Sequence, residues 1–398
     1  MTAATAGAVS PVSVFGPFTG GQWKSLAVDA SASDDEKASA SSAERSLVDE
    51  LRTIANAEFL VVLAGAGCSF SIGPGTAGAT APMMSDLWRA VEKIGTYAKV
   101  KAMLSPAVTA SGNLEHVLSD AHARLALDPS DDDLASFVRE AEDIVWTRCN
   151  FVDHGSALDQ HQLFLRKVAR RSTRLQRTQI FTTNYDRAFE EAARRSRFNV
   201  IDGFGYGGRD FDGGSFDLDY VRRHPHEQLA LEPNVFHLLK LHGSVDWNDD
   251  GGPAIQKFVG KPPSPVLIYP SSTKYQLSYR QPYLEFMSRF QIALRQPDVG
   301  LIVAGFGFND EHLNAPIEAA IRSNSGLRAI VVTPSAKSAP SATTGWIQSL
   351  IELGDKRLTL LNATFDEMVK VLPDMPEQDD RDAHFDRITS AGRGRASP

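Results

Sequence analysis

The chain contains very little cysteine. Of its 398 residues, only Cys68 and Cys149 are cysteines. A zinc site built from cysteines needs three or four ligands with closely spaced pairs, so these two residues exclude one. They also provide no disulfide framework, and such sparse cysteine is typical of proteins in a reducing compartment. We therefore expect a cytoplasmic protein without a cysteine-built zinc module.

The sequence also lacks an excess of positive charge and long apolar runs. Lys and Arg together number 41 against 49 for Asp and Glu, which gives a net charge of -8. Proteins that bind nucleic acid over their whole surface are usually basic, and the local basic stretch 166–177 is more simply explained as a solvated helix face. No stretch approaches the roughly 20 apolar residues that span a bilayer, and the first residues do not have the pattern of a secretion signal.

Both ends of the chain are poor in apolar side chains. Residues 1–44 are rich in Ala, Ser, Thr and Gly, which predicts a mostly disordered or loosely ordered segment with a short ordered arm around residues 15–23. Residues 376–398 are polar and predict a flexible tail. We expect one large domain over residues 45–375, beginning with the helical spacing of residues 43–51.

Short, nearly continuous apolar runs mark the predicted strands of this domain. Such runs are typical of parallel strands covered on both faces, and each is followed by a turn and a helical pattern. The clearest runs are residues 59–63, 179–182, 301–304 and 329–332, with further strands at 235–241 and 357–361 and a last helix at 365–372. Alternating strands and helices predict a doubly wound, Rossmann-like α/β fold with a parallel sheet.

Two stretches interrupt this alternation. Residues 85–178 carry few strand signals and show helical spacing broken by Pro106 and Pro129, which predicts a helical insertion. Residues 203–232 are rich in Gly, Asp and aromatic residues and predict a long loop. Loops of that length usually cover a site or a partner surface.

The first candidate motif is Gly65-Ala66-Gly67-Cys68-Ser69, directly after the strand at 59–63. Glycines let a backbone approach a pyrophosphate closely, and free amides at a helix start favour anionic groups. Phe70 stands where the dehydrogenase fingerprint has its third glycine, which argues against a dehydrogenase. By itself the motif is also compatible with an ordinary tight turn between strand and helix.

Three further motifs follow other predicted strands. Thr182-Thr183-Asn184-Tyr185-Asp186 ends the strand at 179–182, where ligands bind in open α/β sheets, although its polar residues could simply cap the next helix. His242-Gly243 follows an apolar run and indicates either a cleft residue or a structural histidine. Gly305-Phe306-Gly307-Phe308-Asn309-Asp310 forms a glycine-containing loop, with an Asx-capped turn as the simpler interpretation.

In this order, the four motifs resemble those of the sirtuin family over roughly residues 55–375. The resemblance implies that the first loop holds the phosphates of NAD, that Asn184 orients water near the nicotinamide ribose, and that His242 is the general base. Tyr185 and Asp186 would border the nicotinamide pocket, and the fourth motif would approach the adenosine half. The cofactor-binding residues implied in this way are Gly65, Ala66, Gly67, Cys68, Ser69, Thr183, Tyr185, Asp186, Gly305, Phe306, Gly307 and Asn309.

The chain departs from the deacylase sirtuins at several points. Their second motif reads Thr-Gln-Asn-Ile-Asp, which differs here at Thr183 and Tyr185, and Gly307 replaces a usual serine. The four-cysteine zinc module and the Gly-Ile-Pro-Asp-Phe-Arg pattern after the first loop are both missing. The motifs look instead like those of bacterial sirtuin-like NAD hydrolases of anti-phage defence, in which NAD depletion halts the infected cell.

That resemblance implies an NAD hydrolase that releases nicotinamide and ADP-ribose, with NAD as substrate and no metal. It also implies a separate HerA-type ATPase as partner, with nucleic acid reached only through that partner. A homo-oligomer is expected as the general default for proteins, with the helical insertion as the candidate interface. Two alternatives remain open at this stage. The chain could be an NAD-dependent protein deacylase, or a non-catalytic NAD or ADP-ribose sensor that gates a partner. Partner-assisted nuclease activity has no carboxylate cluster in the sequence to support it.

Overall fold

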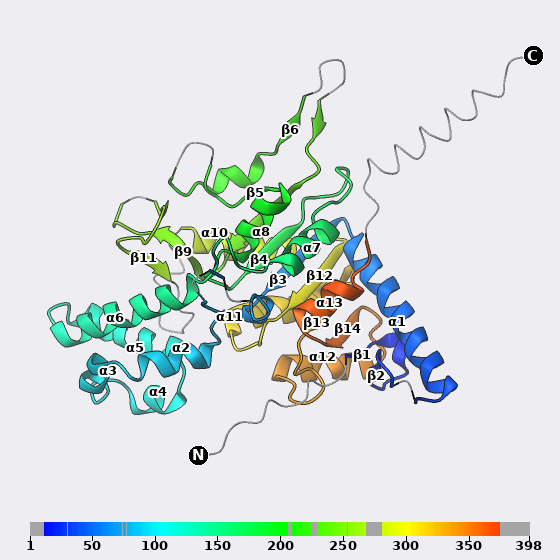
Figure 1. The fold of residues 1–398 in the computed structure, drawn as a ribbon, viewed down its shortest axis with the longest axis horizontal. Helices are drawn as coiled ribbons and strands as arrows, with labels where there is room; N and C mark the ends of the chain where they lie inside the picture. The colour runs from blue at the N-terminus through cyan, green and yellow to red at the C-terminus, as the bar shows by residue number, and fades with distance from the viewer. Residues whose placement is uncertain are drawn as a thin grey trace, which may run out of the picture.

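A computed structural model describes residues 12–29, 31–73, 75–76, 78–205, 209–223, 229–252, 254–267 and 281–374. At its centre lies a nine-stranded sheet with the order β2-β1-β14-β13-β12-β3-β4-β8-β5 (Figure 1). Its strands are β1 (Ser13–Phe15), β2 (Lys24–Ser25), β3 (Phe59–Ala64), β4 (Gln179–Thr182), β5 (Asn199–Ile201), β8 (Val235–Lys240), β12 (Val299–Ala304), β13 (Leu327–Val332) and β14 (Leu358–Asn362). The seven strands from β14 to β5 are parallel, and β1 and β2 add to one edge in antiparallel pairing.

Helices cover both faces of this sheet, because alternate residues of each buried strand face opposite layers. On one face, Leu60 and Val62 of β3 belong to a core shared with α1 (Asp34–Ala55), α7 (Asp159–Val168), α8 (Ala188–Ser196) and α13 (Phe365–Val371). On the other face, Val61 and Leu63 belong to a core shared with α10 (Tyr283–Ala293), α11 (Glu311–Ser323) and α12 (Ala342–Glu352). The doubly wound α/β fold predicted from the sequence is confirmed.

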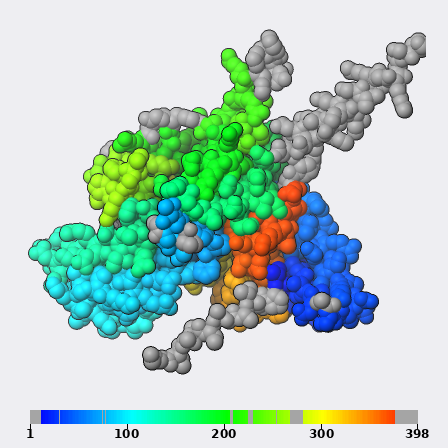
Figure 2. All heavy atoms as spheres, viewed as in Figure 1, coloured from blue at the N-terminus to red at the C-terminus, as the bar shows by residue number. Residues whose placement is uncertain are grey.

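The helical insertion forms a lobe with its own core. It contains α2 (Met84–Val91), α3 (Gly95–Val100), α4 (Pro106–Ser111), α5 (Leu114–Leu127) and α6 (Asp132–Cys149), which project from the body as the cyan region of Figure 2. Two residues from outside the insertion, Tyr185 and Val245, are buried in this core. The last helix before β4, α7, instead packs beneath the sheet through Phe164 and Val168. It therefore belongs to the main body, so the independent lobe ends near residue 149.

The segment expected to be mostly disordered, residues 1–44, is folded over its described part, which includes the short arm expected around residues 15–23. Val14 and Phe15 are buried, and β1 pairs with β14 from Ser13↔Asn362 to Phe15↔Leu360. The Ala- and Ser-rich stretch is the first half of α1, which Ser33 opens with a capping box to Glu36. Ala40 and Ala43 are buried there, so low apolar content did not mean disorder.

The stretch predicted as a long loop carries structure in its described parts. It holds a short 3-10 helix (Gly213–Asp217) and a hairpin of β6 (Val221–Arg222) and β7 (Ala230–Leu231). Phe211 and Phe216 anchor it by packing in edge-on contact with Phe286 of α10. A separate three-stranded sheet joins β9 (Gly243–Asn248) with β10 (Gln256–Lys257) and β11 (Pro265–Leu267). The predicted tail at 376–398 lies outside the described residues.

Among the helices of the described residues, none is long and apolar enough to cross a lipid bilayer.

Candidate functional site

The polar motifs meet where the direction of strand addition in the sheet reverses. After β3 the chain adds β4 and β8 on one side, and it later returns to add β12, β13 and β14 on the other. The loops that follow the adjacent strands β3 and β12 therefore leave toward opposite sides of the sheet. In open α/β sheets this arrangement opens a crevice at the carboxyl ends of the strands, where ligands bind.

Three glycines allow the loops after β3 and β12 to touch backbone to backbone. The N–H of Gly67 donates to the carbonyl of Gly305 at 2.9 Å. A Cβ on Gly65 would lie 2.5 Å from the Gly305 oxygen, and one on Gly67 would lie 2.7 Å from the Gly305 Cα. Gly305 itself has a φ of +60°, which disfavours any other residue. These glycines are therefore required by the packing of the floor of the crevice, whatever it binds.

Cys68 lies behind this loop rather than in the crevice. Its side chain is fully buried, and its Sγ donates to the carbonyl of Ala304 at 3.2 Å. Burial raises the pKa of the thiol far above its ordinary value. A thiol held neutral in this way supports the loop by packing and is a poor nucleophile.

The second motif forms a chain of hydrogen bonds with the first. The Asn184 Nδ2 donates to the Ser69 Oγ at 2.9 Å, and that hydroxyl donates to the Asp186 Oδ2 at 2.8 Å. The other carboxylate oxygen of Asp186 accepts from the N–H of Ala188 at the start of α8. Asp186 therefore satisfies an amide at the start of α8, as the capping interpretation of this motif expected, and it also fixes the Ser69–Asn184 pair.

A buried lysine holds the backbone of the same motif. Lys240, only 3% exposed at the end of β8, donates through its Nζ to the carbonyls of Tyr185 and Asp186. Its ammonium also pairs with Glu190 Oε1 at 3.0 Å. Sequence reasoning missed this residue, because nothing in an apolar strand pattern shows which distant carbonyls a lysine reaches.

His242 and Asp310 form a second buried pair. The His242 Nε2 lies 3.0 Å from the Asp310 Oδ2, and both side chains are more than nine-tenths buried. The other oxygen of Asp310 accepts from the N–H of His312 and caps α11. Burial raises the pKa of Asp310, but the hydrogen bond and charge of His242, with the His312 amide, outweigh burial, so the pKa lies below its ordinary value. The carboxylate is therefore ionised at neutral pH and fixes the imidazole.

These groups surround one cavity of about 420 Å³. That volume is within the usual range for small-molecule sites. Of the fourteen candidate residues, the lining includes Ala66, Gly67, Ser69, Thr183, Asn184, Tyr185, Asp186, His242, Gly305, Phe306, Gly307 and Asn309. Gly65 and Cys68 are the two that stay behind the lining.

The cavity also has walls that the motifs did not reveal. Asp310 ends the fourth motif, but no role in the site was expected of it. Thr333, Pro334 and Ser335 follow β13, and their signal was only their place after a strand. The insertion and the residues at its two ends contribute Met83, Met84, Leu87, Asn113, Glu115, Cys149 and Phe151. No local pattern could have placed an insertion helix against the strand ends.

The described residues contain no group of three or more His, Cys, Asp or Glu side chains arranged to hold a metal ion. The ionisable groups at the cavity are instead engaged in protein hydrogen bonds, as described for Asp186, His242 and Asp310. The site can therefore orient polar ligands and accept a proton with the side chains described here.

Comparison with protein families matches residues 178–350 to the SIR2-like domain. This match covers less than half of the chain and includes the second, third and fourth motifs but not the loop at 65–69. Among solved structures, one titled for the mechanism and regulation of Sir2 enzymes superposes with a TM-score of 0.36 at 13% identity, covering 82% of this chain and 94% of that chain. Another, a Sir2 histidine-to-alanine variant with deacetylated p53 peptide and 3'-O-acetyl ADP-ribose, has a TM-score of 0.34 at 13% identity, with 82% and 96% covered. Comparison with curated protein sequences gives no significant match.

Proposed function

We propose that this protein is an NAD hydrolase that cleaves the bond between nicotinamide and ribose to give nicotinamide and ADP-ribose. The observation that carries the proposal is the meeting of three features at one cavity. These are the glycine loop at 65–69, the hydrogen-bonded Asn184, and the buried pair of His242 and Asp310. The similarity of residues 178–350 to the SIR2-like domain gives independent support for NAD as the ligand.

The residues of the cavity fit the parts of NAD. The backbone of Ala66 and Gly67 offers a surface without bulky side chains, which suits a pyrophosphate. Phe306 and the residues after β13 would take the adenosine half. The nicotinamide and its ribose would then lie near Asn184 and His242, on the side of the cavity that Tyr185 borders.

The reaction needs little acid catalysis. The nitrogen of the bound nicotinamide is already cationic, so the C–N electron pair leaves with a neutral molecule. The ribose passes through an oxocarbenium-like state, and the oxygen of water then bonds to the anomeric carbon, as in other glycoside cleavages. Water gives up one proton in this step, so a base beside the ribose is required.

His242 is the proposed base, and Asp310 sets its tautomer. Because the ionised Asp310 accepts from Nε2–H, the lone pair remains on Nδ1, the atom that can take the proton from water. The carboxylate also stabilises the imidazolium that results. Since Asn184 uses its Nδ2 on Ser69, its carbonyl oxygen would accept from the water or a ribose hydroxyl.

We further propose that NAD depletion serves anti-phage defence in the bacterial cytoplasm, in a homo-oligomer that works with a HerA-type ATPase. The support is the resemblance of the motifs to those defence enzymes. An enzyme that destroys NAD must be restrained at rest, and the projecting insertion lobe is a suitable surface for a restraining contact. Tyr185, buried in the core of that lobe, joins it to the catalytic loop.

Nicotinamide release from NAD tests the proposal directly. We expect release by the full chain, alone or with an ATPase partner, and a fall of about 10²–10⁴ in His242→Ala and Asn184→Ala. His122→Ala is the matched control, because His122 lies in the insertion, where it pairs with Glu142 at a half-buried position, and it does not line the cavity. Turnover near that of the control in both site variants would refute the site. Release that depends on an acyl-lysine peptide would identify a deacylase, and NAD binding without release would identify a sensor.

A further inference from the structure

The wall of the candidate cavity that follows β12 is held by very few hydrogen bonds. Residues 306–309 form this wall, and most of them line the cavity. Within the part of the chain that the structure describes, a single hydrogen bond reaches the backbone of these residues. It comes from Asn314 of α11, whose Nδ2 donates to the carbonyl of Phe308 at 2.9 Å. This one contact therefore restrains the middle of the wall.

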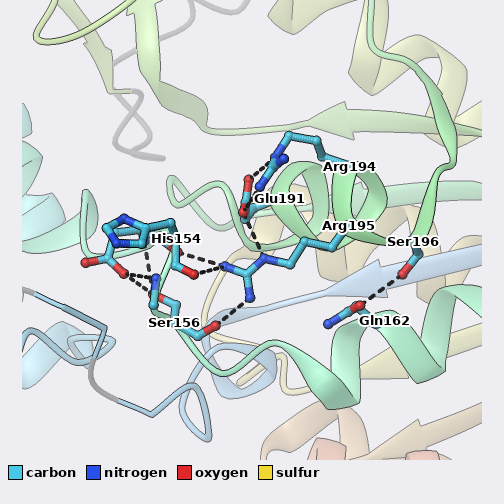
Figure 3. Close-up of polar contacts among 9 residues, drawn as sticks. His154, Ser156, Gln162, Glu191, Arg194, Arg195 and Ser196 are labelled. Atoms are coloured by element: carbon cyan, nitrogen blue, oxygen red, sulfur yellow. Dashed lines mark hydrogen bonds and ion pairs between the residues drawn. The ribbon is translucent and has the colours of Figure 1, made fainter.

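The loop at 153–156, outside the candidate site, is held much more firmly. Figure 3 shows Arg195 reaching from α8 to this loop, where its guanidinium donates to the carbonyl of Ser156 at 2.7 Å and to that of His154 at 3.1 Å. Hydrogen bonds within the loop add to these contacts. Loss of one bond there would leave several others, whereas the wall at 306–309 would keep none among the described residues.

Phe308 needs a restraint because its backbone conformation is unfavourable. Its φ is +55°, in the left-handed region that residues other than glycine seldom adopt. Arg197 also has a positive φ, but it ends α8, where this conformation is common. Phe308 instead lies within the wall, nearly buried, with its ring centroid 5.1 Å from that of Phe306. Without the bond from Asn314, a change to negative φ would turn the adjacent peptides and shift the groups that face the cavity.

Asn314 is placed for this one contact. It lies one turn into α11, where its N–H donates to the carbonyl of Asp310 at 2.9 Å. Helix side chains lean toward the N-terminus, which directs this amide back to the loop. Asn314 is only 5% exposed and does not line the cavity, and among the described residues its Oδ1 has no hydrogen-bond partner. The bond to Phe308 is therefore the one side-chain hydrogen bond that offsets the burial of the amide.

We propose that Asn314 is a positioning residue for NAD, which holds residues 306–309 in the shape that receives the adenosine half. It acts through Phe308 and does not touch the ligand. This inference rests on the proposed function, in which Phe306 binds the adenosine half. Losing the bond lowers the fraction of molecules whose wall is competent to bind, and the affinity falls by that fraction. A hydrogen bond of this kind changes such an equilibrium by up to about tenfold.

The test compares Asn314→Leu with Asn324→Leu in the full chain. Leucine is close to asparagine in size and removes the unpartnered oxygen together with the donor, so the melting temperature should shift by no more than about 4 °C. Asn324 is the matched control, because its Nδ2 also donates to backbone carbonyls, at the opposite end of α11. ADP-ribose is the probe, since it carries the adenosine half and is not consumed.

We expect Asn314→Leu to bind ADP-ribose about tenfold more weakly than the wild type in calorimetry, and Asn324→Leu to bind it within about twofold. The KM for NAD should rise by a similar factor in Asn314→Leu. Its kcat should stay within about threefold of wild type, because His242 and Asp310 keep their own hydrogen bonds. A merely structural role would lower the melting temperature without this split between KM and kcat.

Relaxation of backbone 15N nuclei examines the wall without a ligand. The order parameters of residues 306–309 should fall from about 0.85 toward about 0.6 in Asn314→Leu and stay unchanged in Asn324→Leu. If Asn314→Leu does not fold, Asn314→Thr replaces it. Its hydroxyl can bond the carbonyl of Asp310 within the helix, and the side chain is too short to reach Phe308.

The outcomes separate this inference from the proposed function. Wild-type protein that does not bind ADP-ribose would contradict the proposed function, and with it the ligand named here. Wild-type protein that binds ADP-ribose, together with equal affinity in a folded Asn314 variant, would overturn the inference alone. Unchanged order parameters at 306–309 in that variant would overturn it as well.

Discussion

Replacing Asp310 with asparagine should change the tautomer of His242 while leaving the packing of the site almost unchanged. The substitution keeps the Oδ1 that accepts from the His312 N–H, and Asn is as good a helix cap as Asp. At the other end it places an NH2 group 3.0 Å from the His242 Nε2, where the carboxylate stood. Two donors cannot face each other, so the imidazole must accept at Nε2 and carry its proton on Nδ1.

The expected cost differs sharply between stability and catalysis. The contact survives as a neutral hydrogen bond of reversed direction, so the free energy of unfolding should fall by only about 1 kcal/mol. The atom that would take the proton from water is blocked, however, so turnover should fall by about 10²–10⁴. Because the pKa of Asp310 lies below its ordinary value, the wild-type carboxylate is ionised throughout the neutral range, and the contrast between variant and wild type should hold there.

The assay is nicotinamide release at saturating NAD, together with thermal unfolding and NAD affinity for both proteins. Nearly unchanged unfolding and NAD affinity with a large loss of turnover would support the assigned roles. Turnover within about threefold of wild type in a folded Asp310→Asn protein would refute the argument, since general bases are worth far more than that.

Three further substitutions test the loop and the ionisable groups around it. Gly67→Ala should lower the free energy of unfolding by about 1–3 kcal/mol and weaken NAD binding, because its Cβ would meet the Gly305 Cα at 2.7 Å. Gly73→Ala is the control, since its Cβ would make only an ordinary 3.6 Å contact. Equal melting temperatures of the two variants would contradict the prediction. Burial lowers the pKa of His161 to about 4, so its contribution to stability is present above the unfolded value of about 6.5 and is lost as the pH falls toward 4. His161→Phe should flatten the fall in stability over that range, as measured by urea unfolding at several pH values. A hydrogen bond from Arg194 lowers the pKa of Glu191 to about 2, so the stability lost in Glu191→Gln should shrink as the pH falls from 4.5 to 2; a difference independent of pH would exclude that role.

Most of the central sheet could be predicted from the sequence, because each buried strand gives a pattern within a few consecutive residues. The run predicted at 179–182 coincides with β4, and those at 301–304 and 329–332 end where β12 and β13 end. Parallel strands covered on both faces give continuous apolar runs, which few other elements produce. The strand β5 (Asn199–Ile201) was missed because three residues at a sheet edge leave no periodic signal.

The parts of the site that escaped prediction depend on contacts between distant residues. Asp310 pairs with a histidine 68 positions away, and Lys240 reaches carbonyls more than 50 positions away. The insertion wall depends on how a whole lobe docks, through contacts such as the hydrogen bond from the Trp146 indole to the Val245 carbonyl at 2.7 Å. The roles assigned to the motif residues stay predictions until turnover is measured.

The reversal of strand order between β3 and β12 also determines how early during synthesis the candidate site can form. The glycine loop at 65–69 rests on Gly305, which the ribosome adds about 240 residues later. The proposed base, which follows β8, likewise finds its carboxylate only after β12 has left the exit tunnel and α11 has begun. A growing chain therefore has neither a supported loop nor an oriented histidine until Gly305 and Asp310 have been made. If the proposed NAD hydrolysis is correct, this order of assembly keeps a partly synthesised chain from consuming the NAD of its own cell.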